Sequence, residues 1–186
     1  MTRPASLDPP DRRLPAVAAA ALVASFDAGG IVVSGMLYLY ACDPGPGASP
    51  GCPVARAPLA QATSHDAWRV WDGSDWSADL TSGVSVIMDV PGDLSVSWNA
   101  YLGSYLSVHS VPLSNDVVYQ TAASPQGPWS PEQYLFTGRH DASHTNYAAK
   151  EHPELARDGG RTLVVSYADA AEGIGSRIRV ALPTLP

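Results

Sequence analysis

Leu37-Tyr38-Leu39-Tyr40 is the first of three short apolar stretches whose repetition decides the fold expected for this chain. The second stretch is Tyr105-Leu106-Ser107-Val108, and the third is Leu163-Val164-Val165-Ser166-Tyr167. Each reads as a buried strand, and each is followed about fifteen residues later by another strand-like stretch. These following strands are expected at residues 54–57, 119–123 and 177–181.

The two series of strands advance along the chain in step. Equivalent positions in the first strands, Leu39, Leu106 and Val164, are separated by 67 and then 58 residues. Equivalent positions in the following strands are separated by 66 and then 59 residues. Whole units therefore repeat. Repeats of roughly this length that carry several short strands are typical of propeller blades. We expect an all-β fold with about three antiparallel sheets of four or nearly four strands each, arranged as an open, partial β-propeller.

Composition agrees with many short strands in one domain. The 186 residues include 17 Pro and 16 Gly but only 16% charged residues, which favours tight turns over long solvated helices. Only residues 58–67 are expected to form a turn or two of helix. We divide the chain into a Pro- and Ala-rich lead-in (1–25) and one domain (26–186). Its units cover about 26–78, 93–135 and 150–182.

Charge and hydropathy exclude two partner classes. The net charge is −7 and the 11 Lys and Arg are scattered, so a nucleic-acid partner is not expected. No apolar run reaches the roughly 20 residues that span a bilayer. Arg12-Arg13 followed by the apolar residues 16–23 is reminiscent of a secretory signal, whereas Asp8, Asp11 and several prolines indicate a linker, and both readings remain open.

Cys42 and Cys52 bracket a Pro- and Gly-rich loop between two expected neighbouring strands. Opposite positions on antiparallel strands can bring Cα atoms within the roughly 4.4–6.8 Å that a disulfide requires. We expect a disulfide, with two buried free thiols as the alternative. Further zinc ligands are not visible nearby.

Several short motifs, taken in order, carry a family resemblance. They are Tyr38-Leu39-Tyr40, Val54-Ala55-Arg56-Ala57-Pro58, Trp71-Asp72-Gly73 with Trp76, Ser95-Val96-Ser97-Trp98-Asn99 with Tyr101-Leu102-Gly103 and Tyr105, Gly127-Pro128-Trp129-Ser130, and His152-Pro153-Glu154-Leu155 with Ser166-Tyr167. On these motifs residues 26–182 resemble the bacterial five-bladed propellers of domain of unknown function 4185, similar in architecture to arabinanase and xylosidase propellers. The resemblance implies glycoside-hydrolase-like chemistry on an arabinan-type polysaccharide, outside the cell or in a bacterial cell envelope.

The number of units departs from that family. A five-bladed ring needs about five units, whereas the chain shows three, which resemble the later blades. We therefore expect a fragment that lacks part of the catalytic apparatus. A carbohydrate-binding module without catalysis, or a structural remnant, is the alternative. Open blade faces are also expected to favour self-association.

Glycoside hydrolysis requires two carboxyl groups about 5–9.5 Å apart. In a propeller such groups lie at the axial starts of inner strands, which singles out Glu151 and Asp27 as catalytic candidates, with Glu154 as a further carboxylate. The alternatives are a turn former for Asp27, before Gly29-Gly30, and a surface strand residue for Glu154. His152 is expected to contact ligand or an axial metal ion, or else to join neighbouring blades.

The expected sugar contacts are His152, Tyr147, Trp98, Asn99 and Trp71. Tryptophan offers a flat apolar face for a sugar ring, and Trp98 beside Asn99 is the best placed to line a funnel. Trp76 and Trp129 are expected to pack between blades instead. His140, Asp141 and His144 lie in a loop-like sequence, so a metal site is not favoured there. No cofactor is expected, and an axial metal ion is left open.

Overall fold

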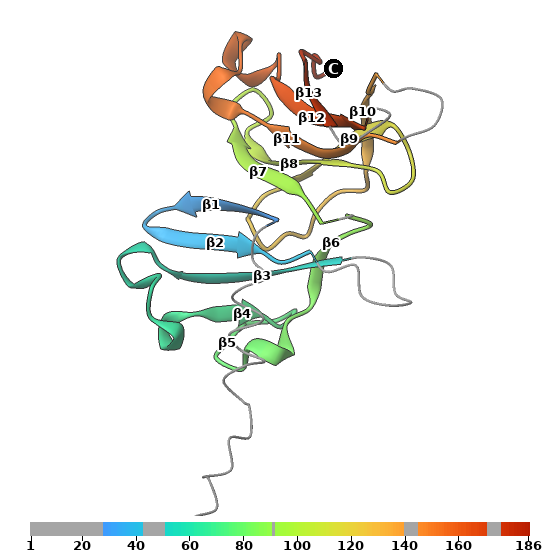
Figure 1. Cartoon of the computed structure of the whole chain (residues 1–186). Coiled ribbons are helices and arrows are strands. Elements are labelled where there is room, and N and C mark those ends of the chain that lie inside the picture. Colours follow the sequence, from blue (N-terminus) through green and yellow to red (C-terminus); the bar gives the residue numbers. More distant parts are fainter. Residues whose placement is uncertain (1–27, 43–50, 91, 140–144, 171–175) are drawn as a thin grey trace, which may run out of the picture.

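The computed structural model describes residues 28–42, 51–90, 92–139, 145–170 and 176–186, which form β-strands and short 3₁₀ helices (Figure 1). The strands are β1 Gly29–Val33, β2 Met36–Tyr40, β3 Gly51–Pro58, β4 Arg69–Trp71, β5 Trp76–Ser77, β6 Ser85–Met88, β7 Leu94–Asn99, β8 Ser104–Ser110, β9 Asp116–Ala122, β10 Gln133–Thr137, β11 Tyr147–Glu151, β12 Val165–Ala170 and β13 Ser176–Ala181. The 3₁₀ helices are η1 Leu59–Gln61, η2 His65–Ala67, η3 Leu80–Ser82, η4 Pro153–Leu155 and η5 Asp158–Gly160. No helix in these ranges is long and apolar enough to cross a bilayer.

The strands form three antiparallel sheets. The first has the order β1-β2-β3-β4-β5, with β6 paired to β3, the second has the order β10-β9-β8-β7, and the third has the order β11-β12-β13. Figure 1 shows β7 between the first sheet and β11, with no closure into a ring. The all-β, partial-propeller fold expected from the sequence is therefore confirmed. The first sheet has more strands than expected because β3 is long enough to pair with β4 at one end and β6 at the other.

The first and second sheets pair their strands at the positions that the repeat predicts, whereas the third sheet pairs them in a shifted register. Leu39 lies opposite Ala55, and Leu106 lies opposite Thr121. In the third sheet β12 begins at Val165, two residues later than expected, and the backbone N–H of Leu163 donates instead to the carbonyl of Pro183 at 2.9 Å. Helices η1 and η2 lie in residues 58–67, the one region where helix was expected.

Buried side chains join neighbouring sheets. Tyr40 from β2 and Leu94 from β7 belong to one apolar core, and Trp129 packs against it, as expected for a residue between blades. The Tyr40 hydroxyl donates to the carbonyl of Pro125 at 2.6 Å, and burial raises the pKa of Tyr40 above its ordinary value. A second core, which includes Leu106 and Leu163, joins the second and third sheets. The first of these cores holds β7 against the first sheet, because Leu94 is part of it.

Cys42 and Cys52 form a disulfide with a Cα–Cα distance of 4.2 Å. Cys52 lies in β3, and Cys42 follows β2 closely. The backbone N–H of Ala41 donates to the carbonyl of Pro53 at 3.1 Å, so the two strands remain adjacent where the disulfide closes the loop.

Candidate functional site

The candidate site is built on the contact between β7 and β11, which belong to different sheets. The hydroxyl of Ser97 donates to Oε2 of Glu151 at 2.5 Å, and the backbone N–H of Glu151 donates to the hydroxyl of Ser95 at 2.7 Å. Ser95 and Ser97 are two residues apart, so both side chains leave the same face of β7. Ser95 therefore binds the backbone of Glu151, and Ser97 binds its carboxyl group.

Glu151 is the last residue of β11, not the first residue of an inner strand as the sequence suggested. The strand begins earlier, at Tyr147, in a segment whose two alanines gave a weak strand signal. It ends here because Pro153 lacks a backbone N–H and opens the 3₁₀ helix η4. Glu154 is at the surface, as one of the two readings expected, but it lies in η4 and not in a strand.

Glu151 opens onto a cavity of about 240 Å³. Trp98 and Asn99 line it from the end of β7, while Pro153, Gly159 and Gly160 contribute from the loops around η4 and η5. The Trp98 side chain is 53% exposed and is held edge to face against Tyr105, with ring centroids 5.1 Å apart. Glu151 and Trp98 thus line one cavity, although Trp98 leaves the opposite face of β7 from Ser95 and Ser97.

Asn99 lines the cavity and forms hydrogen bonds with two neighbouring loops. Its Nδ2 donates to the carbonyl of Gly160 at 2.8 Å, and its Oδ1 accepts from the backbone N–H of Leu102 at 3.0 Å. Gly160 has φ +99°, and a Cβ there would lie 3.1 Å from the Asn99 amide. Asn99 therefore positions the η5 loop against the turn between β7 and β8.

Burial raises the pKa of Glu151 above its ordinary value, because an ionised carboxylate loses hydration there. The hydrogen bond from Ser97 and the nearby His152 act in the opposite direction, whereas the negative charge of Glu154 adds to the rise. A carboxyl group with a raised pKa keeps its proton at higher pH, which suits a general acid.

His152 lies beside this carboxyl group but does not line the cavity. Its Nε2 lies 2.8 Å from the hydroxyl of Ser166, and its Nδ1 lies 3.5 Å from Oε1 of Glu154. The imidazole therefore connects η4 to β12 through side-chain contacts. Within the described ranges, no three His, Cys, Asp or Glu side chains form a group that could hold a metal ion.

A protein-family model matches residues 10–170, which is most of the chain. The model is domain of unknown function 4185 (DUF4185). The chain belongs to the DUF4185 family. No curated protein matches the sequence.

Solved structures share the fold of this DUF4185 domain. A candidate hydrolase from Bacteroides ovatus ATCC 8483 matches with a TM-score of 0.58 and 18% identity, over 81% of this chain and 39% of the other. A thermostable family-43 glycoside hydrolase matches with a TM-score of 0.52 and 17% identity, over 83% of this chain and 46% of the other. The chain thus spans less than half the length of either protein, and the likeness establishes a glycoside-hydrolase-like propeller fold.

The DUF4185 domain brings only some of the predicted site residues together. Glu151, Trp98 and Asn99 line one cavity, whereas Trp71 lines a different one. Tyr147 begins β11, four residues before Glu151, and is not among the residues that line the cavity. Asp27 lies outside the described residues, as do His140, Asp141 and His144.

Sequence reasoning missed Ser95 and Ser97 as supports of Glu151. Their spacing already placed both side chains on one face of a strand, but no sequence signal linked that face to a residue 54 positions later. Gly160, which approaches the buried amide of Asn99, was not predicted to take part in the site.

Proposed function

We propose that this DUF4185 domain binds a polysaccharide in the Glu151 cavity and that Glu151 serves there as the general acid for cleavage of a glycosidic bond. The observation that carries the proposal is that the buried Glu151 and the half-exposed Trp98 line the same cavity. The indole offers a face for a sugar ring, and the protonated carboxyl group can donate its proton to the departing glycosidic oxygen.

Hydrolysis also needs a second carboxyl group, and we propose Asp27 for this role. The described backbone supports the choice: the N–H of Leu94, at the start of β7, donates to the carbonyl of Ala28 at 3.1 Å. Strand β7 therefore borders both the residue that follows Asp27 and, through Ser95 and Ser97, Glu151. Asp27 would act as base or nucleophile opposite the general acid.

The proposed substrate is an arabinan-type polysaccharide outside the cell or in a bacterial cell envelope. Support comes from the family resemblance and from the fold shared with a family-43 glycoside hydrolase. The cavity of about 240 Å³ would accept a single sugar unit rather than a long segment of the polymer. Binding of longer chains would therefore continue outside it.

Turnover of arabinan, arabinogalactan and xylan tests this proposal. Glu151→Gln keeps the size of the side chain and removes the acidic proton, so the rate should fall about 10²–10⁴-fold while binding persists. Asp27→Asn should lower the rate similarly, and Asp66→Asn, at a fully exposed position, is the matched control. Turnover that Glu151→Gln leaves unchanged would overturn the assignment of the general acid.

A second candidate function is carbohydrate binding without catalysis. It is favoured because, among the described residues, Glu151 is the one carboxyl group that lines the cavity. In that case the wild-type chain would bind these polysaccharides without turnover. Trp98→Ala should weaken the binding, because it removes the accessible aromatic face.

A further inference from the structure

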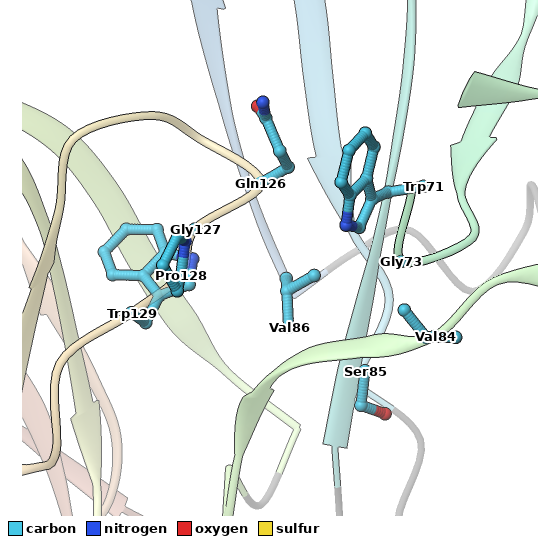
Figure 2. Close-up of a pocket in the computed structure, with 9 residues that line it drawn as sticks. All are labelled: Trp71, Gly73, Val84, Ser85, Val86, Gln126, Gly127, Pro128 and Trp129. Atoms are coloured by element: carbon cyan, nitrogen blue, oxygen red, sulfur yellow. The ribbon is translucent and has the colours of Figure 1, made fainter. Parts of the chain in front are cut away.

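A larger cavity, of about 550 Å³, lies between the first sheet and the loop that joins β9 to β10 (Figure 2). Trp71 and Trp129 lie on opposite sides of it, and Val86 lies between them. Gln126 projects from the β9–β10 loop at the rim. The cavity shares no lining residue with the Glu151 cavity, so it is a separate feature of the domain.

The structure holds both walls of this cavity in place. On one wall, the ring of Trp71 packs against Trp76 with centroids 5.4 Å apart, and the guanidinium of Arg56 lies 4.1 Å over the Trp76 ring. On the other wall, the Tyr40 hydroxyl bonds to the carbonyl of Pro125 at 2.6 Å, immediately before the loop residues that line the cavity. The hollow is therefore largely formed before any ligand arrives.

The wall chemistry selects the kind of ligand. The described lining contains no Asp, Glu, Lys, Arg or His. The amide of Gln126 is its polar side chain, because the hydroxyl of Ser85 points toward Gly51 and away from the cavity. The remaining side chains are aromatic or aliphatic. Such walls fit a neutral molecule that presents apolar C–H faces to indole rings and hydroxyl groups to an amide. A neutral sugar has both properties.

We propose that this cavity, flanked by Trp71 and Trp129, is a second carbohydrate-binding site that holds a neutral sugar unit away from the Glu151 cavity. Its volume falls within the roughly 300–1,000 Å³ of small-molecule sites. The site does not depend on Glu151 or on cleavage. It would retain a neutral polysaccharide on the domain through a second contact, and this raises the apparent affinity for long chains.

Polysaccharide binding in a Trp98→Ala background tests the second site, because that substitution weakens the other cavity. Arabinan, xylan and β-1,3-galactan serve as neutral probes, and polygalacturonate serves as an anionic one. Trp71→Ala should weaken binding of a neutral probe by about tenfold or more, since one aromatic wall is lost. Val84→Asp is a second variant: Val84 lines the cavity and is 39% exposed, so the substitution adds a charge without emptying the core.

The proposal predicts residual neutral-probe binding in Trp98→Ala, weakened further by Trp71→Ala and by Val84→Asp, with polygalacturonate bound less well than the neutral probes. If circular dichroism shows that Trp71→Ala is unfolded, neutral-probe binding by Val84→Asp provides the test of the second site. Loss of all binding in Trp98→Ala alone, unchanged binding in Val84→Asp, or preferential binding of polygalacturonate would overturn it. Turnover measured in Glu151→Gln reports on the other cavity, so a failure of either proposal can be recognised separately.

Discussion

Ser97 and Glu151 share a 2.5 Å hydrogen bond although they lie on strands of different sheets, β7 and β11. The Ser97 hydroxyl stabilises the ionised form of a carboxyl group that burial pushes toward the protonated form. The protonation state of Glu151 thus depends on how the second and third sheets pack.

Removal of this hydroxyl should raise the pKa of Glu151 further. Ser97→Ala abolishes the hydrogen bond that lowers the pKa and leaves the opposing effect of burial in place. The carboxyl ¹³C chemical shift of Glu151, followed by NMR against pH, measures the change. Ser95→Ala is the matched control, because Ser95 contacts the backbone N–H and not the carboxyl group. An unchanged or lowered pKa in Ser97→Ala would contradict this account.

Glu151 should also make stability depend on pH. Since its pKa is raised by folding from an ordinary value of 4.5, the folded protein holds this proton more tightly than the unfolded chain. The resulting stability is present below about pH 4.5 and is lost as pH rises through the folded-state pKa. Glu151→Gln does not titrate, so the Tm of the wild type should fall relative to this variant from pH 4 to pH 8.

Thermal unfolding of both proteins across this range gives the measurement, with Asp66→Asn as the control for a fully exposed carboxylate. A wild-type Tm that rises relative to Glu151→Gln would mean that the pKa of Glu151 is lowered on folding.

The sequence predicted pairing within sheets better than contacts between them. Leu39 and Ala55 were recognised as members of neighbouring strands because apolar alternation and a short loop are local signals, and the structure places them opposite one another. The start of β11 was missed because Ala148 and Ala149 carry little strand propensity, so Glu151 was assigned to the wrong end of its strand.

The candidate site depended on contacts that no local pattern encodes. Trp98 and Asn99 were expected to line a funnel because they lie near an inner strand, and the structure brings them to the cavity that Glu151 lines. Trp71 was grouped with them on aromatic character alone, yet it lies on the first sheet and lines the other cavity. Aromatic residue type identifies a possible platform, whereas sheet packing decides which cavity it faces.

Loss of the Cys42–Cys52 disulfide should destabilise the first sheet. The disulfide closes a loop of about ten residues between strands β2 and β3, so chain entropy predicts a loss of about 3 kcal/mol. For a domain of this size, that corresponds to a fall in Tm of about 6–12 °C. Differential scanning calorimetry of a Cys42→Ser, Cys52→Ser double variant, with wild type in reductant as the parallel sample, measures the effect. Equal Tm values would show that the disulfide adds no net stability.

Gly160→Ala should distort the Glu151 cavity through Asn99. The new methyl group would lie 3.1 Å from the Asn99 amide and would also sit on a backbone with φ +99°. Gly159→Ala is a matched control, because its φ of +68° is also unfavourable for alanine but its Cβ meets nothing within 4 Å. Left-handed backbone alone costs about 1–2 kcal/mol. Gly160→Ala should therefore lose more stability in urea unfolding than Gly159→Ala, and it should shift the Trp98 indole N–H resonance further than Gly159→Ala does. Equal stability losses and an unmoved Trp98 resonance would mean that Asn99 does not carry strain from the η5 loop to the cavity.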